Sequence, residues 1–332
     1  MPTGHQVALA KAAERIPTPT ALPGGTWYEP KWDGFRAVIG RGERVRISSR
    51  TGTDLTDRFP EIAAAAERDL PPGCTIDGEL VAWEAGRLDF PALQRRMVSS
   101  KSGIAEQART GAVAYVAFDV LEVAGNDTRH LPLRHRLALL RELAAGWSPP
   151  LSLTMGTDDV EQARAWFDEL AAAGLEGIVA KGLGQRYEPG QRIWTKVKRR
   201  DALDVVVAAV TGTRQAPTDL LVGLPIDGQI RIVGRTAALS GARAAQVGAL
   251  LAPPEGVPLW PAQVPRRWVE RFTGNQDPLR LTPVRPVVVE VLADAAWDGR
   301  SFRHALRLVR VRPDLDVEQV RLPAHLGRPG SP

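Results

Sequence analysis

The chain has little of what exported and membrane proteins need. Only one of its 332 residues is a cysteine, Cys74, which excludes an internal disulfide and a cysteine-based zinc site. No apolar run approaches the roughly 18 residues that span a bilayer. The N-terminus also lacks the basic and then apolar stretch of a signal peptide. We therefore expect a soluble protein of a reducing compartment, the cytoplasm, with no membrane partner.

Two further absences narrow the class. The histidines show no metal-ligand spacing, so we assign no histidine ligand. No repeat of 20 to 50 residues runs through the chain, which argues against a solenoid or propeller. With 44% hydrophobic residues over 332 positions, the chain is long enough for two domains of the usual size.

Positive charge gathers in two places, although the net charge is only +5. Residues 181–200 hold seven lysines and arginines against one acid, and residues 300–312 hold five arginines and no acid. Such clusters favour a polyphosphate or nucleic-acid partner. Solvated strand edges are an equally good explanation on composition alone.

The pattern of the chain changes near residue 201. Before it, the chain combines apolar and alternating runs typical of strands with two segments of helical periodicity, residues 131–143 and 158–173. After it, short strands and glycine-rich turns surround one helical stretch, residues 240–251. We predict an α+β protein of two domains, a mixed α/β domain over residues 1–200 and a β-barrel of the OB-fold type over residues 201–325.

Polar islands follow one another in the first domain. The stretch "EPKWDGFRAV" (29–38) places Lys31 and Asp33 between a strand and its exit turn. Later islands are "SSRTG" with Arg50, "IDGELVAW" with Glu79, "AFDVL" with Phe118, "EGIVAK" with Glu176 and Lys181, and "WTKVK" with Lys196 and Lys198.

Charge placement within these islands suggests an anion and a metal. Side chains alternate along a strand, so Lys196 and Lys198 share one face, and two neighbouring cations need an anion. The carboxylates of Asp33, Glu79 and Glu176 are of the kind that hold Mg²⁺. Mg²⁺ with cationic side chains is typical of phosphoryl and nucleotidyl transfer.

In their order, the islands resemble the covalent nucleotidyltransferases, and specifically the ATP-dependent DNA ligases. The resemblance runs from the KxDGxR motif at Lys31 to "RHALRLVRVRPD" (303–314), and it is especially clear in "DGELVAWEAGRLDFPALQRR" (77–96). Length and ending are similar to the short bacterial C-class ligases. The first domain would then be an ATP-grasp-like nucleotidyltransferase (adenylyltransferase) domain. The enzyme would be a monomer that seals 5′-phosphate/3′-OH nicks in duplex DNA, with ATP and Mg²⁺ or Mn²⁺, in DNA repair, recombination or replication.

The resemblance implies that Lys31 attacks the α-phosphate of ATP and forms lysyl-AMP. AMP would pass to the 5′-phosphate of the nick, and the 3′-OH would displace it. A neutral Lys31 is required, yet a free lysine has a pKa of about 10.4. Lowering the pKa to roughly 7 or 8 requires about 4 kcal/mol, and we expect Mg²⁺, Lys196 and Lys198 to provide it.

The other ATP contacts also follow from the resemblance. The adenine, ribose and metal contacts would be Glu29 for the amino group, Phe118 for stacking, and Glu79 and Glu176 for metal and ribose. Arg36 and Arg50 would meet the ribose or the nick phosphate, and Lys181, Lys196 and Lys198 the α-phosphate. On the barrel, Arg310 and Arg312 would orient the pyrophosphate leaving group. Arg192 would be a further ATP contact. Two departures affect this set, because Arg192 lies closer to Trp194 than is usual and Leu315 stands where the last motif commonly has a lysine.

Ordinary readings and other functions stay open. Phe118 is also a good core residue, and Asp33-Gly34 and Asp77-Gly78 are good turn dipeptides. An RNA ligase or a capping-type nucleotidyltransferase would share the KxDG lysine, and GTP labelling would distinguish the capping type. A non-catalytic nucleic-acid-binding OB protein is the alternative from a different class.

Overall fold

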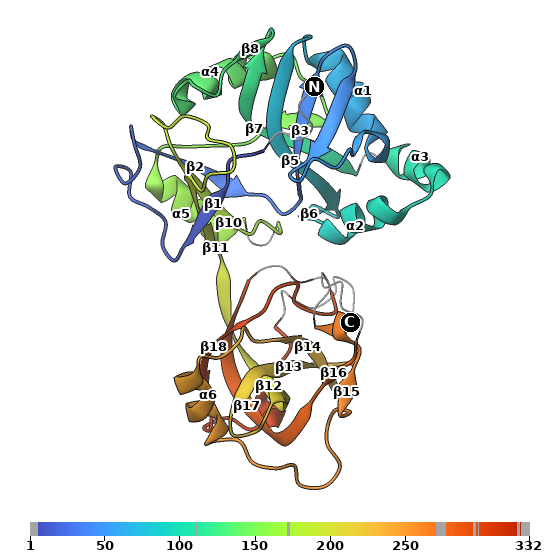
Figure 1. Cartoon of the computed structure of the whole chain (residues 1–332), viewed down its shortest axis with the longest axis vertical. Coiled ribbons are helices and arrows are strands. Elements are labelled where there is room, and N and C mark those ends of the chain that lie inside the picture. Colours follow the sequence, from blue (N-terminus) through green and yellow to red (C-terminus); the bar gives the residue numbers. More distant parts are fainter. Residues whose placement is uncertain are drawn as a thin grey trace. The chain divides into compact units, whose positions relative to one another are not determined.

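The structure is a computed structural model that describes residues 6–109, 112–170, 173–269, 277–294, 297, 299–323 and 326. The chain forms two compact units, Met1–Arg199 and Arg200–Pro332. In Figure 1 the blue and green elements belong to the first unit and the orange elements to the second. In the described part of the chain, no helix is long and apolar enough to cross a bilayer.

A seven-stranded sheet is the larger of the two sheets of the first unit. Its main path runs β4-β3-β5-β7-β8, while β6 pairs with β5, and β9 runs parallel to β7. The strands are β3 (Phe35–Arg41), β4 (Val45–Ser49), β5 (Cys74–Glu84), β6 (Arg87–Leu88), β7 (Val113–Val123), β8 (Asn126–Asp127) and β9 (Leu151–Leu153). Its core includes Ile39, Leu80 and Tyr115, each fully buried.

The second sheet of this unit has four strands in the order β1-β11-β10-β2. They are β1 (Ala10–Ala13), β2 (Thr26–Lys31), β10 (Gly177–Gly182) and β11 (Trp194–Lys198). The pairing of β1 with β11 is parallel, and the other two pairings are antiparallel.

Helices cover these sheets. They are η1 (Thr56–Arg58), α1 (Pro60–Asp69), α2 (Phe90–Val98), α3 (Lys101–Arg109), α4 (Leu133–Ala144) and α5 (Val160–Glu169). α4 packs on β7, and α5 packs on β2 and β10. The N-cap of α5 is Asp159, whose carboxylate accepts the N–H of Glu161 at 2.8 Å.

The second unit is built around a five-stranded antiparallel sheet in the order β14-β13-β12-β17-β18. A parallel bridge between Thr236 and Leu306 joins the chain just after β14 to the chain just before β18. Leu306 there donates to the carbonyl oxygen of Arg235 at 2.9 Å. The two edges of the sheet therefore meet. The elements are β12 (Arg200–Gly212), β13 (Pro217–Ile226), β14 (Gln229–Arg235), α6 (Gly241–Gly248), β15 (Gln263–Val264), η2 (Arg266–Trp268), β16 (Leu279–Arg280), β17 (Thr282–Asp294), β18 (Arg307–Val311) and η3 (Val317–Gln319).

The prediction of a mixed α/β protein is confirmed, but the turn reading of Asp77-Gly78 is wrong. Both residues lie inside β5, between β3 and β7. A Cβ atom on Gly78 would overlap the Tyr115 ring and the Val116 carbonyl oxygen of β7. Glycine is needed here for close strand approach and not for a turn.

Candidate active site

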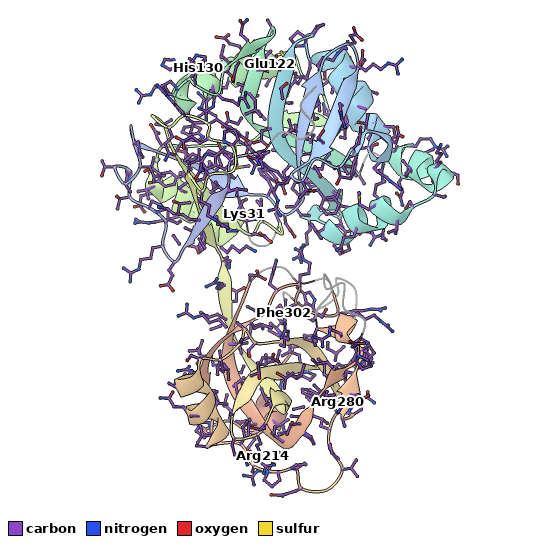
Figure 2. All side chains as sticks on the ribbon, viewed as in Figure 1. Lys31, Glu122, His130, Arg214, Arg280 and Phe302 are labelled. Carbon is purple, nitrogen blue, oxygen red and sulfur yellow. The ribbon has the colours of Figure 1, made fainter. Side chains whose placement is uncertain are left out.

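A cavity of about 550 Å³ is lined by residues of both sheets of the first unit. Lys31, labelled in Figure 2, lies in its wall as the last residue of β2. Predicted site residues in the lining are Glu29, Lys31, Arg36, Arg50, Glu79, Phe118, Lys181, Arg192 and Lys196. Side chains from positions 29 to 196 of the sequence thus share one cavity.

Lys31 forms an ion pair with Glu176, and Lys198 lies 3.3 Å from the same carboxylate oxygen. Burial lowers the pKa of Lys31, but the carboxylates of Glu176, Glu79 and Asp33 outweigh it, so the pKa is raised above the usual value. The prediction that Mg²⁺, Lys196 and Lys198 lower this pKa concerns the site with its metal ion bound, and it stays a prediction. Without the metal ion, the neighbouring acids keep the pKa of Lys31 high.

Glu79 carries the clearest signature of crowded negative charge. Burial, reinforced by Glu176 and Asp33, raises its pKa to about 7, although Lys31 and Arg36 oppose the shift. The described residues contain no group of three or more histidine, cysteine or acidic side chains arranged for a metal ion. Mg²⁺ is normally held by one or two carboxylates together with substrate phosphates and water, and this crowded set fits that mode.

Glu29 and Lys181 form a buried ion pair in the cavity wall, with Nζ 2.7 Å from Oε2. Trp27 donates its indole N–H to the other oxygen of Glu29 at 3.1 Å, and Lys181 also donates to the Phe118 carbonyl oxygen at 3.0 Å. The Lys181 ammonium lies over the rings of Phe118 and Trp194, at 4.6 and 4.5 Å from the centroids. Lys181 was expected to contact the α-phosphate. The structure instead places it beside the aromatic rings, with its charge neutralised by Glu29.

Arg36 lies in the cavity wall but is held by Asp77. Its guanidinium donates to both carboxylate oxygens, Nε at 2.7 Å and Nη2 at 2.6 Å. Its Cζ atom also lies over two rings, 4.8 Å from the centroid of Phe118 and 4.9 Å from that of Trp194. The ribose or nick-phosphate contact expected of Arg36 therefore competes with a bidentate ion pair.

Lys196 and Arg192 contribute positive charge to the cavity. Lys196 lies on the same face of β11 as Lys198, as the alternation predicted, and both are more exposed than Val197. Burial, followed by the charges of Lys31 and Lys198, lowers the pKa of Lys196. Arg192 donates to the Ala10 carbonyl oxygen at 3.5 Å.

Arg310 and Arg312 belong to the second unit, and each pairs with acids of that unit. Arg310 lies 2.6 Å from Glu290. Arg312 lies 3.0 Å from Asp204 and 2.8 Å from Asp314.

Several cavity residues were not predicted. Trp194 lines the cavity, and the alternation that placed Lys196 and Lys198 on one face also places Trp194 there. Trp32 lines it too and donates its indole N–H to Thr154 at 3.0 Å. Residues 6–10 contribute Gln6, Val7, Leu9 and Ala10, and no local pattern in the sequence marks them.

A cavity that joins lysines, crowded carboxylates and aromatic rings belongs to an enzyme that handles nucleotides. Residues 8–198 match the family model described as the ATP dependent DNA ligase domain, which is more than half of the chain. The protein therefore belongs to the ATP-dependent DNA ligase family, as the ordered motifs predicted, and is a ligase that uses ATP.

Curated relatives extend this similarity over most of the chain. DNA ligase C2 of Mycolicibacterium smegmatis is 38% identical over 315 residues, covering 89% of this chain and 88% of the relative. DNA ligase C of Mycobacterium tuberculosis is 34% identical over 333 residues, covering 93% and 92%. The resemblance to short bacterial ligases is thereby confirmed.

Among solved structures, one from a study of Lig E DNA ligases and their DNA binding aligns with a TM-score of 0.55 at 18% identity, covering 92% of this chain and 99% of the other. This match shows that the fold is shared.

Proposed function

We propose that this ligase seals nicks with a 5′-phosphate and a 3′-OH in duplex DNA, and that Lys31 is the residue that carries AMP. The observation that supports this most directly is the position of Lys31 in the wall of a cavity that also holds cationic, acidic and aromatic side chains. Each type of side chain would contact a different part of ATP and its metal ion. The aromatic rings and Glu29 would contact the base, the lysines the phosphates, and the other carboxylates the metal ion.

In the proposed reaction, Lys31 first loses its ion pair with Glu176, and its ammonium group gives up a proton to water. The freed amine then forms a bond to the α-phosphorus, and the bond to pyrophosphate breaks. AMP next passes from Lys31 to the 5′-phosphate of the nick. The 3′-OH displaces AMP in the last step and joins the strands.

Mg²⁺ would be held by Glu79, Glu176 and Asp33 together with the ATP phosphates. When bound, the ion would supply positive charge that offsets the negative charge of the phosphates. It would also compete with Lys31 for Glu176, and loss of that ion pair lowers the pKa of Lys31 toward the value that attack requires. Mn²⁺, a similar hard cation, would use the same oxygens.

The second unit would be an OB-fold over residues 201–325, and the first an adenylyltransferase domain over residues 1–200. Support for the barrel comes from the five-stranded sheet, its edge-to-edge bridge at Thr236 and Leu306, and the helix α6 between β14 and β17. OB-folds bind nucleic acids. For Arg310 and Arg312 to orient pyrophosphate, as the resemblance implies, each must exchange its carboxylate partner for phosphate. We expect the enzyme to act as a monomer in the cytoplasm.

The test is covalent labelling with α-labelled ATP, followed by a nicked-duplex sealing assay. Wild type should form a protein-AMP adduct, and Lys31→Ala and Lys31→Arg should form none. Lys31→Arg keeps the positive charge opposite Glu176 and so separates nucleophilicity from charge. The exposed Lys101→Ala is the control and should label normally. Adduct formation in both Lys31 variants would refute the assignment, and an adduct with GTP in place of ATP would indicate a capping-type enzyme.

A further inference from the structure

One wall of the cavity comes from a segment that we call the strap, residues Gln6–Ala13. Its β1 part pairs with β11 at the edge of the four-stranded sheet. Next to β1, Leu9 donates to the Gln191 carbonyl oxygen at 2.8 Å and accepts from the Trp194 N–H at 3.1 Å. The strap is therefore attached to the smaller sheet by its backbone.

The strap is also attached to the larger sheet, through the backbone of Ala8. The Ala8 N–H donates to the Tyr187 hydroxyl at 3.0 Å, and the Ala8 carbonyl oxygen accepts from Arg36 at 3.2 Å. Tyr187 and Arg36 both bind Asp77 of β5. The Tyr187 hydroxyl donates to the Asp77 carboxylate at 2.6 Å, and Arg36 forms an ion pair with it. Asp77 and Ala8 are fully buried. This network joins the two sheets that line the cavity.

Apolar packing strengthens the same junction. Val7 and Ala8 belong to a buried cluster with Val38, Phe118 and Trp194. Phe118 comes from the larger sheet and Trp194 from the smaller one, so the strap contacts the aromatic part of both walls.

We propose that the strap is a latch that sets the spacing of the two walls of the ATP cavity, with Asp77 and Tyr187 as its positioning residues. The proposal rests on the proposed function of the cavity. Tyr187 is not in the lining and would not touch the reacting atoms. Its effect would therefore fall on ATP binding, through preorganisation of the walls, and not on bond formation at Lys31.

The hydroxyl of Tyr187 is suited to this role because it stays protonated. Burial and the neighbouring charge of Asp77 raise its pKa well above the usual value. It can then donate to Asp77 while it accepts from Ala8. Removal of the hydroxyl leaves the Ala8 N–H without this partner.

Comparison of two phenylalanine substitutions tests the latch. Tyr187→Phe removes the hydroxyl of the latch, and the control Tyr115→Phe removes an equally buried hydroxyl that donates to the carbonyl oxygens of Ala37 and Ile76 instead. We expect Tyr187→Phe to raise the ATP concentration for half-maximal adduct formation about tenfold, with the maximal rate changed less than about threefold. Tyr115→Phe should shift neither value by more than about twofold. Equal shifts in both variants, or no shift in Tyr187→Phe, would overturn the proposal.

A second measurement uses the wild-type chain and needs no variant to fold. Amide hydrogen exchange is followed with and without α,β-methylene-ATP, an analogue that cannot transfer AMP. We expect exchange at Ala8 and Leu9 to slow at least about fivefold when the analogue binds, with no change in helix α1, none of whose residues line the cavity. Unchanged exchange in the strap at saturating analogue would overturn the latch. A wild-type chain that binds the analogue but forms no adduct with ATP would instead count against the proposed function.

Discussion

Replacement of Glu79 by glutamine should stabilise the ligand-free protein while it impairs ligation. Glu79 has a pKa of about 7 in the folded chain against an ordinary value of 4.5. Between these values the folded state binds a proton that the unfolded state has lost. The contribution of Glu79 to the free energy of unfolding therefore falls as pH rises through this window, and above pH 7 it has its full destabilising value. The difference between these two pKa values corresponds to about 3 kcal/mol, at about 1.36 kcal/mol per pKa unit.

Urea unfolding between pH 5 and pH 8, with a chelator to remove divalent ions, measures this directly. Glu79→Gln should match wild type near pH 5 and gain on the order of 2 to 3 kcal/mol at pH 8, with unchanged m-values. Glu84→Gln is the control, since Glu84 is an exposed acid at the end of the same strand. If the difference in free energy of unfolding between Glu79→Gln and wild type did not depend on pH, it would refute the claim that ionised Glu79 destabilises the folded protein. Added Mg²⁺ should raise the free energy of unfolding of wild type only, and so reduce the difference between wild type and Glu79→Gln.

Two further predictions concern the buried ion pair in the cavity wall and the binding of nicked DNA. Lys181→Met should lower the free energy of unfolding by about 3 to 5 kcal/mol, because it leaves the Glu29 carboxylate buried without its cation. The double variant Lys181→Met/Glu29→Gln should recover part of this loss. A Lys181→Met variant as stable as wild type would contradict the ion-pair assignment. Binding of nicked duplex DNA should weaken steeply with salt. For each phosphate contact, a tenfold rise in salt concentration should lower the logarithm of the binding constant by about 0.9. A binding constant that does not change in titrations at several ionic strengths would argue against phosphate contacts.

The order of the motifs predicted which residues would meet, but not which partners would neutralise them. Lys31 and Glu176 lie 145 positions apart, yet each stands in its own recognisable island and the structure brings them into contact. The raised pKa of Lys31 depends on the balance between burial and three acids, and that balance is set by distances in space that spacing along the chain does not contain.

The parts that the sequence did not predict all depend on long-range packing. Tyr187 and Ala8 carry no local pattern, and they meet only because the chain before β11 and the strap run side by side. Asp77-Gly78 has the local form of a turn, but its neighbours β3 and β7 make it the centre of a sheet. Period-two alternation, in contrast, correctly placed Lys196 and Lys198, because it needs only the strand itself.

The ion pair between Lys31 and Glu176 has a consequence for the resting enzyme. An ammonium group has no lone pair, so protonated Lys31 does not react with carbon dioxide, aldehydes or other electrophiles in the cell. If Lys31 carries AMP as proposed, its amine would become reactive only after ATP and the metal ion have bound. Amine-directed reagents should accordingly spare this lysine during storage and in the absence of nucleotide.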